Sequence, residues 1–145
     1  MASNDTKATV HFADNDFFIG ITPSGHAQAI ETNSTRASAA TPMELLLLAL
    51  GSCTGVDVIS ILKKKRQQVT EYRIEVSGER REDFPRSYTR LKVKHILSGR
   101  RLSEQAVASA IELSDQKYCS VAATLRGSAE IVTSYEIVEK GSRDG

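Results

Sequence analysis

The chain has 145 residues, with 19 basic and 18 acidic side chains and a net charge of +1 at neutral pH. This length predicts a single domain over residues 1–145. A charge so close to zero gives no reason to expect a nucleic acid or a membrane as a partner. The polar start lacks the apolar core of a signal peptide, so we expect a cytoplasmic protein.

Two cysteines, Cys53 and Cys119, stand in a chain that we expect to remain in a reducing compartment. A structural disulfide is unusual there, so each thiol is inert, catalytic or redox-active. The three histidines show no metal-ligand spacing with either cysteine. No metal is therefore expected.

Three short extended runs open the chain, at residues 8–12, 17–21 and 26–31. Turn-forming residues separate them, which predicts an antiparallel meander. The following segment, residues 32–40, is small and polar, and Arg36 is its only charge. It is predicted to be a loop that leads into a helix.

A long helix is predicted from Thr41 to Arg66. Thr41 and Glu44 form a capping-box pattern at its start, and four basic residues close its end. The apolar run 45–50 leaves no polar face, which predicts burial by a sheet, by a second subunit, or by both. Because Gly51, Ser52, Thr54 and Asp57 interrupt it, the apolar stretch is predicted to be too short for a membrane span.

We therefore expect an obligate homodimer with this helix at its centre. Gly51 and Gly55 lie on either side of Cys53, and their spacing predicts a groove that another backbone approaches. Asp57 lies one turn after Cys53. It is expected to make hydrogen bonds in the dimer core, because an unpaired buried charge is costly.

Alternating side chains predict a long hairpin from residues 72–77 and 90–97. Its basic outer face is interpreted as solvated, and His95, on the apolar side, as a core histidine. Ser103 caps a helix over 104–113, and a break at 114–117 precedes a helix that begins at Tyr118. A strand from 129 to 137 completes the order βββ-α-ββ-αα-β, an α+β pattern with helices on antiparallel sheet.

Two motifs resemble those of a known family. Residues 42–46 and 49–53 resemble the first cysteine helix of the OsmC/Ohr family, and residues 118–121 resemble its second cysteine motif. The segment 54–58 is similar to the branch typified by the YhfA protein. The resemblance implies an intertwined homodimer whose antiparallel sheets wrap around long central helices.

The same resemblance implies thiol peroxidase chemistry. A Cys53 thiolate would attack the O–O bond of a hydroperoxide, and Cys119 would condense with the resulting sulfenic acid to form a disulfide. An external dithiol would then reduce the pair. No bound cofactor is implied.

One position departs from the family pattern. The family has a catalytic Glu ten residues before the first cysteine, where this chain has Met43. An apolar thiol stays protonated unless a cation offsets its surroundings. We therefore expect Arg36 to activate Cys53 and Glu44 to hold Arg36.

Two other classes of protein remain open at this stage. One is a non-enzymatic dimer that binds a small apolar ligand near an inert Cys53. The other is an acyl-thioester enzyme of the hotdog type, which also wraps a sheet around an apolar helix. Three strands before the helix and two helices after the hairpin fit that type poorly.

Overall fold

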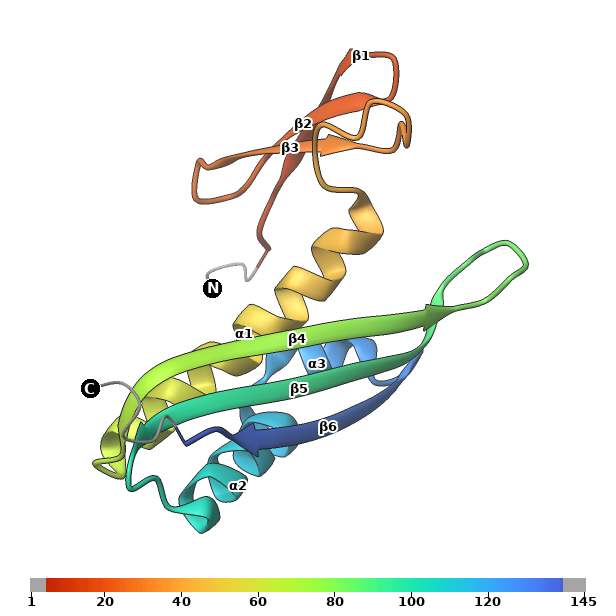
Figure 1. Cartoon of the computed structure of the whole chain (residues 1–145). Helices are drawn as coiled ribbons and strands as arrows, with labels where there is room; N and C mark the ends of the chain where they lie inside the picture. Colours follow the sequence, from red (N-terminus) through yellow and green to blue (C-terminus); the bar gives the residue numbers. More distant parts are fainter. Residues whose placement is uncertain (1–4, 140–145) are drawn as a thin grey trace. The chain divides into compact units, whose positions relative to one another are not determined.

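A computed structural model describes residues 5–139 (Figure 1). The elements are β1 (Thr9–Asp14), β2 (Phe17–Ile21), β3 (Ala27–Glu31), α1 (Pro42–Lys64), β4 (Gln68–Arg80), β5 (Tyr88–Arg100), α2 (Glu104–Leu113), η1 (Ser114–Tyr118), α3 (Ser120–Leu125) and β6 (Glu130–Ile137). This order confirms the predicted α+β class. The chain divides into two compact units, Met1–Leu46 and Leu47–Gly145. One domain over the whole chain stays a prediction.

The first unit contains the predicted meander, with β1, β2 and β3 adjacent and antiparallel. The ring centroids of Phe12 and Phe18, which pair across β1 and β2, lie 5.5 Å apart. Every residue of β1 is exposed, and the apolar side chains of Val10 and Phe12 are 61% and 66% exposed. Apolar side chains on an outer strand are therefore uncovered in a single chain.

Helix α1 begins as the sequence predicts. The Glu44 N–H donates to Thr41 Oγ1 at 3.2 Å, and the Thr41 N–H donates to Glu44 Oε1 at 2.9 Å. The predicted burial of residues 45–50 is not reached within one chain, because only Leu50 of that run is buried. Leu48 is 65% exposed and Val56 is 67% exposed.

The apolar stretch of helix α1 is longer than predicted. Over 18 residues its mean hydropathy reaches 2.1, enough by length and composition to cross a membrane. The interruptions at Gly51, Ser52, Thr54 and Asp57 do not lower this average enough, so the length argument against a span is wrong. The core helices of soluble proteins have the same composition, and the absence of a membrane partner stays a prediction.

The second unit is built on the sheet β4-β5-β6, with helices against one face (Figure 1). β4 and β5 form the predicted antiparallel hairpin, but β6 runs parallel to β5. The expectation of purely antiparallel pairing fails here because the intervening helices form a crossover, which parallel neighbours require. The core between the helices and the sheet consists of Val58, Leu62, Leu97, Val107, Ala110 and Ile111.

The basic face of the hairpin is solvated, as predicted. Its three central cations pair with acidic neighbours in the same sheet. The distances are 3.2 Å for Arg90–Glu130, 4.0 Å for Lys92–Glu79 and 3.1 Å for Lys94–Glu136. Local pairing leaves little excess positive charge on this face.

The groove at Gly51 and Gly55 receives side chains rather than a second backbone. A Cβ added at Gly55 would lie 2.7 Å from Ile74 Cδ1, and one at Gly51 would lie 3.0 Å from Val76 Cγ2. Both neighbours belong to β4. The glycines therefore let α1 pack closely against the sheet of its own chain, which corrects the prediction.

Gly99 in β5 allows the closest approach in this sheet. A Cβ there would lie 2.1 Å from the carbonyl oxygen of Gln68 and 2.8 Å from Leu102 Cδ2. Because a backbone atom cannot rotate away, Gly99→Ala should destabilise the protein by at least about 2 kcal/mol, as overpacking of a tight site does. Urea denaturation would measure this loss. Gly127→Ala is the matched control, since a Cβ there meets nothing within 4 Å, and an equal loss in both variants would contradict the prediction.

Candidate active site

Cys53 and Cys119 come together in the second unit. Cys53 lies on α1 and is partly exposed, whereas Cys119 precedes α3 and is only 3% exposed. Both are free thiols, and they lie near enough to each other for Cys53 to influence the pKa of Cys119. The fold thus places these cysteines in the same neighbourhood, while an approach to disulfide distance and a disulfide between them stay predictions.

The segment that presents Cys119 differs from the predicted break and helix start. Residues Ser114–Tyr118 continue α2 as a single π-helical turn, η1, and the Cys119 N–H donates to the Ser114 carbonyl at 2.8 Å. Cys119 itself is extended and caps α3, because the Ala122 N–H donates to its Sγ at 3.4 Å. Cysteine is not among the usual capping residues, so sequence rules begin this helix too early.

The surroundings of Cys119 favour its protonated form. Burial raises the pKa of the Cys119 thiol from 9.0 to about 11, and the N–H of Ala122 acts in the opposite direction. The nearby Cys53 thiol and the negative charge of Asp57 raise this pKa further.

Arg36 belongs to the first unit and is held there by a carboxylate that the sequence analysis missed. Its Nε forms an ion pair with Glu31 Oε2, and its guanidinium carbon lies 5.8 Å from the centre of the Phe17 ring. Glu44, the predicted partner of Arg36, instead completes the cap of α1 with Thr41. The catalytic roles of Arg36 and Glu44 stay predictions.

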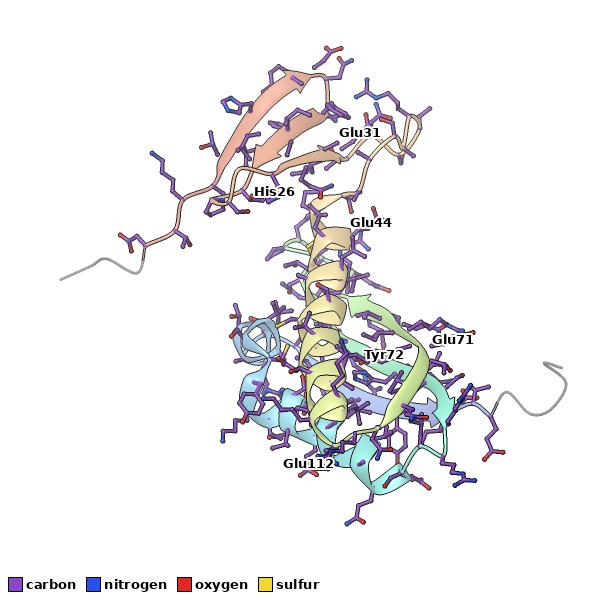
Figure 2. The ribbon with its side chains drawn as sticks, turned by 90° about the vertical axis from the view of Figure 1, so that its left-hand side faces the viewer. His26, Glu31, Glu44, Glu71, Tyr72 and Glu112 are labelled. Atoms are coloured by element: carbon purple, nitrogen blue, oxygen red, sulfur yellow. The ribbon has the colours of Figure 1, made fainter. Side chains whose placement is uncertain are left out.

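Glu31 is the last residue of β3, beside the loop that carries Arg36 (Figure 2). Its side chain is fully buried, and the N–H and hydroxyl of Ser38 each donate to Oε1 at 2.7 Å. Burial alone would raise the pKa of this carboxyl, but the bonds from Ser38 and Arg36 outweigh it and lower the pKa below 4.5. An acidic residue at a strand end, five positions before the only charge of a loop, was the available sequence signal.

His95 lies in the core of the second unit, as predicted. It is fully buried, and its Nδ1 lies 2.7 Å from the hydroxyl of Tyr72, a residue that lies beside α1 (Figure 2). Among the described residues its Nε2 has no hydrogen-bond partner. Burial lowers the pKa of His95 from 6.5 to about 4, although Asp115 acts in the opposite direction.

This histidine should make stability fall in mild acid. The unfolded chain binds a proton near pH 6.5 but the folded protein only near pH 4, so stability is complete above 6.5 and decreases between these values. From pH 7 to pH 5 we expect a loss of about 2 kcal/mol, since one pKa unit corresponds to about 1.4 kcal/mol. Urea unfolding of the wild type and His95→Asn at both pH values would measure it.

His26→Asn is the control, because His26 is exposed. That variant should keep the acid-dependent loss, and His95→Asn should lack most of it. An unchanged loss in His95→Asn would show that another group is responsible.

The fold and its paired thiols define a class of two-cysteine α+β proteins, and comparisons with known proteins identify it. Residues 34–134 match the family described as OsmC-like protein. The chain is 42% identical over 132 residues to protein YhfA of Escherichia coli K12, a match that covers 91% of this chain and 98% of YhfA. The chain therefore belongs to the OsmC-like family, and the predicted resemblance is confirmed.

Solved structures agree with this assignment. A hypothetical protein from Aquifex aeolicus VF5 has a TM-score of 0.84 and 34% identity, covering 95% of this chain and 99% of that chain. The organic hydroperoxide resistance protein OhrB of Bacillus subtilis has a TM-score of 0.63 at 12% identity, covering 91% and 98% of the two chains. The second similarity concerns the fold alone. Neither comparison supports the hotdog alternative.

Proposed function

We propose that this protein reduces organic hydroperoxides with electrons from an external dithiol. The observation that carries this proposal is the proximity of a partly exposed thiol, Cys53, to a buried thiol, Cys119, whose pKa Cys53 influences. Two comparisons support the proposal. The chain belongs to the OsmC-like family, and its fold resembles that of an organic hydroperoxide resistance protein.

The proposed reaction begins at Cys53. Its thiolate sulfur attacks the outer oxygen of the hydroperoxide, the O–O bond breaks, and an alkoxide leaves and takes a proton to become the alcohol. Cys53 is then a sulfenic acid. Cys119 attacks that sulfur, so an S–S bond forms, the S–O bond breaks, and hydroxide leaves with the thiol proton as water.

The exposure of the two thiols and the pKa of Cys119 indicate which thiol attacks the peroxide and which forms the disulfide afterwards. Cys53 is the more exposed thiol, so a peroxide in solution reaches it more readily than it reaches Cys119. Cys119 has a raised pKa and is buried, which suits the second step rather than attack on a free peroxide. A dithiol such as dithiothreitol would then exchange with the disulfide and restore both thiols.

The proposal includes a homodimer and excludes a bound cofactor. Leu48 and Val56 of α1 and Val10 and Phe12 of β1 are more than half exposed in one chain. On each of these two elements a second copy of the chain would cover apolar side chains that one chain leaves exposed. Arg36 remains the proposed activating cation on the sequence argument, with Glu31 rather than Glu44 as the carboxylate that orients it.

The direct test is to incubate the purified protein with an organic hydroperoxide and dithiothreitol and to measure the loss of peroxide over time. Catalytic turnover supports the proposal. An inert Cys53 thiol towards alkylation at neutral pH, together with no turnover, would overturn it in favour of a non-enzymatic protein that binds a small apolar ligand.

A further inference from the structure

Three polar side chains are joined beside the cysteine pair. Ser114 Oγ donates to Asp57 Oδ2 at 2.9 Å, and Ser114 Oγ also lies 2.8 Å from Thr54 Oγ1. A carboxylate accepts only, so Ser114 uses its hydrogen on Asp57 and the Thr54 hydroxyl donates to Ser114. The bonds therefore run in one direction, from Thr54 through Ser114 to Asp57, and these three residues are called the Ser114 network.

The network is buried at its centre. Ser114 is fully buried and Thr54 is 6% exposed. Removing one hydroxyl from such a group leaves its partner without a hydrogen bond, which costs far more than at a surface. The network is thus a firm connection between α1 and the start of η1.

Its position connects the two cysteines. Thr54 directly follows Cys53, and Asp57 lies one turn further along α1. At the other end, Ser114 begins the π-helical turn whose last hydrogen bond joins the Cys119 N–H to the Ser114 carbonyl. π-Helical turns are rare and occur often at functional sites. Anchoring Ser114 therefore fixes where η1 presents Cys119.

We propose that the Ser114 network is a positioning device that holds Cys119 against Cys53 and so favours formation of their disulfide. This inference rests on the proposed thiol chemistry but names residues that do not touch the peroxide. Holding two reacting groups in place raises their effective concentration. Loosening η1 therefore disfavours the disulfide without changing either thiol.

Asp57 has a second effect that separates this role from a purely structural one. Its negative charge is among the groups that raise the pKa of the Cys119 thiol, after burial and together with Cys53. Asp57→Asn keeps the shape of the side chain but removes the charge. The pKa of Cys119 should then fall, as measured by the pH dependence of alkylation in a Cys53→Ser background.

The principal experiment measures the equilibrium between dithiol and disulfide in dithiothreitol buffers, by alkylation and mass spectrometry. Ser114→Ala and Thr54→Val should each shift it about tenfold towards the dithiol, or about 30 mV for a two-electron couple. Thr54→Ser keeps the hydroxyl and should retain the wild-type value. Ser109→Ala is the matched control, because that serine instead accepts from Lys65 Nζ at 3.1 Å.

The outcomes separate this inference from the proposed function. The network has no positioning role if the wild type forms the disulfide and Ser114→Ala and Thr54→Val leave the dithiol–disulfide equilibrium unshifted, provided that circular dichroism shows both variants to be folded. A shifted equilibrium in a wild type that consumes no peroxide supports the network and overturns the peroxidase proposal. A wild type that forms no disulfide under any oxidant overturns both.

Discussion

Cys53→Ser should abolish dithiol-dependent peroxide consumption. A serine hydroxyl is not ionised at neutral pH and does not attack the O–O bond, whereas a thiolate does. The rate should fall on the order of 10³-fold or more, the scale on which loss of a nucleophile acts. Loss of an organic hydroperoxide in the presence of dithiothreitol, at equal protein concentration, is the measurement.

Cys119→Ser provides the informative companion. It keeps the first step, so one equivalent of peroxide should be consumed quickly and a sulfenic acid should accumulate on Cys53, where dimedone traps it. Cys53→Ser should give no such adduct. Turnover at the wild-type rate in Cys53→Ser would refute the assignment of the nucleophile, and the same rate in Cys119→Ser would refute the disulfide step.

Arg36→Ala should slow peroxide reduction by at least about tenfold, equivalent to about 1.4 kcal/mol of transition-state stabilisation. The reason is that a thiol in apolar surroundings needs a cation to react at neutral pH, and Arg36 is the cation that the sequence analysis selects. Its side chain is 39% exposed, and the two bonds from Ser38 to the buried Glu31 carboxylate remain, so the fold should survive the change. Steady-state peroxide consumption and the rate of Cys53 alkylation should both decrease.

Two further variants make this result specific. Glu31→Gln keeps the size of the side chain but weakens the ion pair that orients Arg36, so it should give a smaller loss in the same direction. Arg73→Ala is the control, because Arg73 is an exposed arginine that pairs with Glu75 on the sheet surface. If Arg36→Ala reacts at the wild-type rate, Arg36 serves only the loop, and its bond to Glu31 is structural.

Local signals predicted most of the secondary structure. The capping box of Thr41 and Glu44 predicted the start of α1, and alternation predicted the hairpin of β4 and β5. These signals work because each depends on residues that are close in sequence. The start of α3 was misplaced, because its cap is the sulfur of Cys119, a group that capping preferences do not include.

The candidate site was predicted unevenly for the same reason. Both cysteines were found through motifs, but Glu31 and the Ser114 network were not, since their roles depend on partners that sequence spacing does not reveal. Glu31 was read only as the end of a strand, although the loop that follows closes over its carboxylate. Ser114 was read as a helix break, although it binds two side chains of a helix nearly sixty residues earlier.

By itself the sequence determined the order of the elements, the family and the identity of the two thiols, because these follow from periodicity, capping and short motifs. Tertiary structure alone decided that β6 runs parallel to β5, that Glu31 rather than Glu44 binds Arg36, and that Thr54 and Asp57 anchor the turn before Cys119. In each case the sequence offers several strands or side chains of similar chemistry that could form the interaction. The choice among them is made by packing, which brings one candidate within hydrogen-bonding distance and removes water from around it.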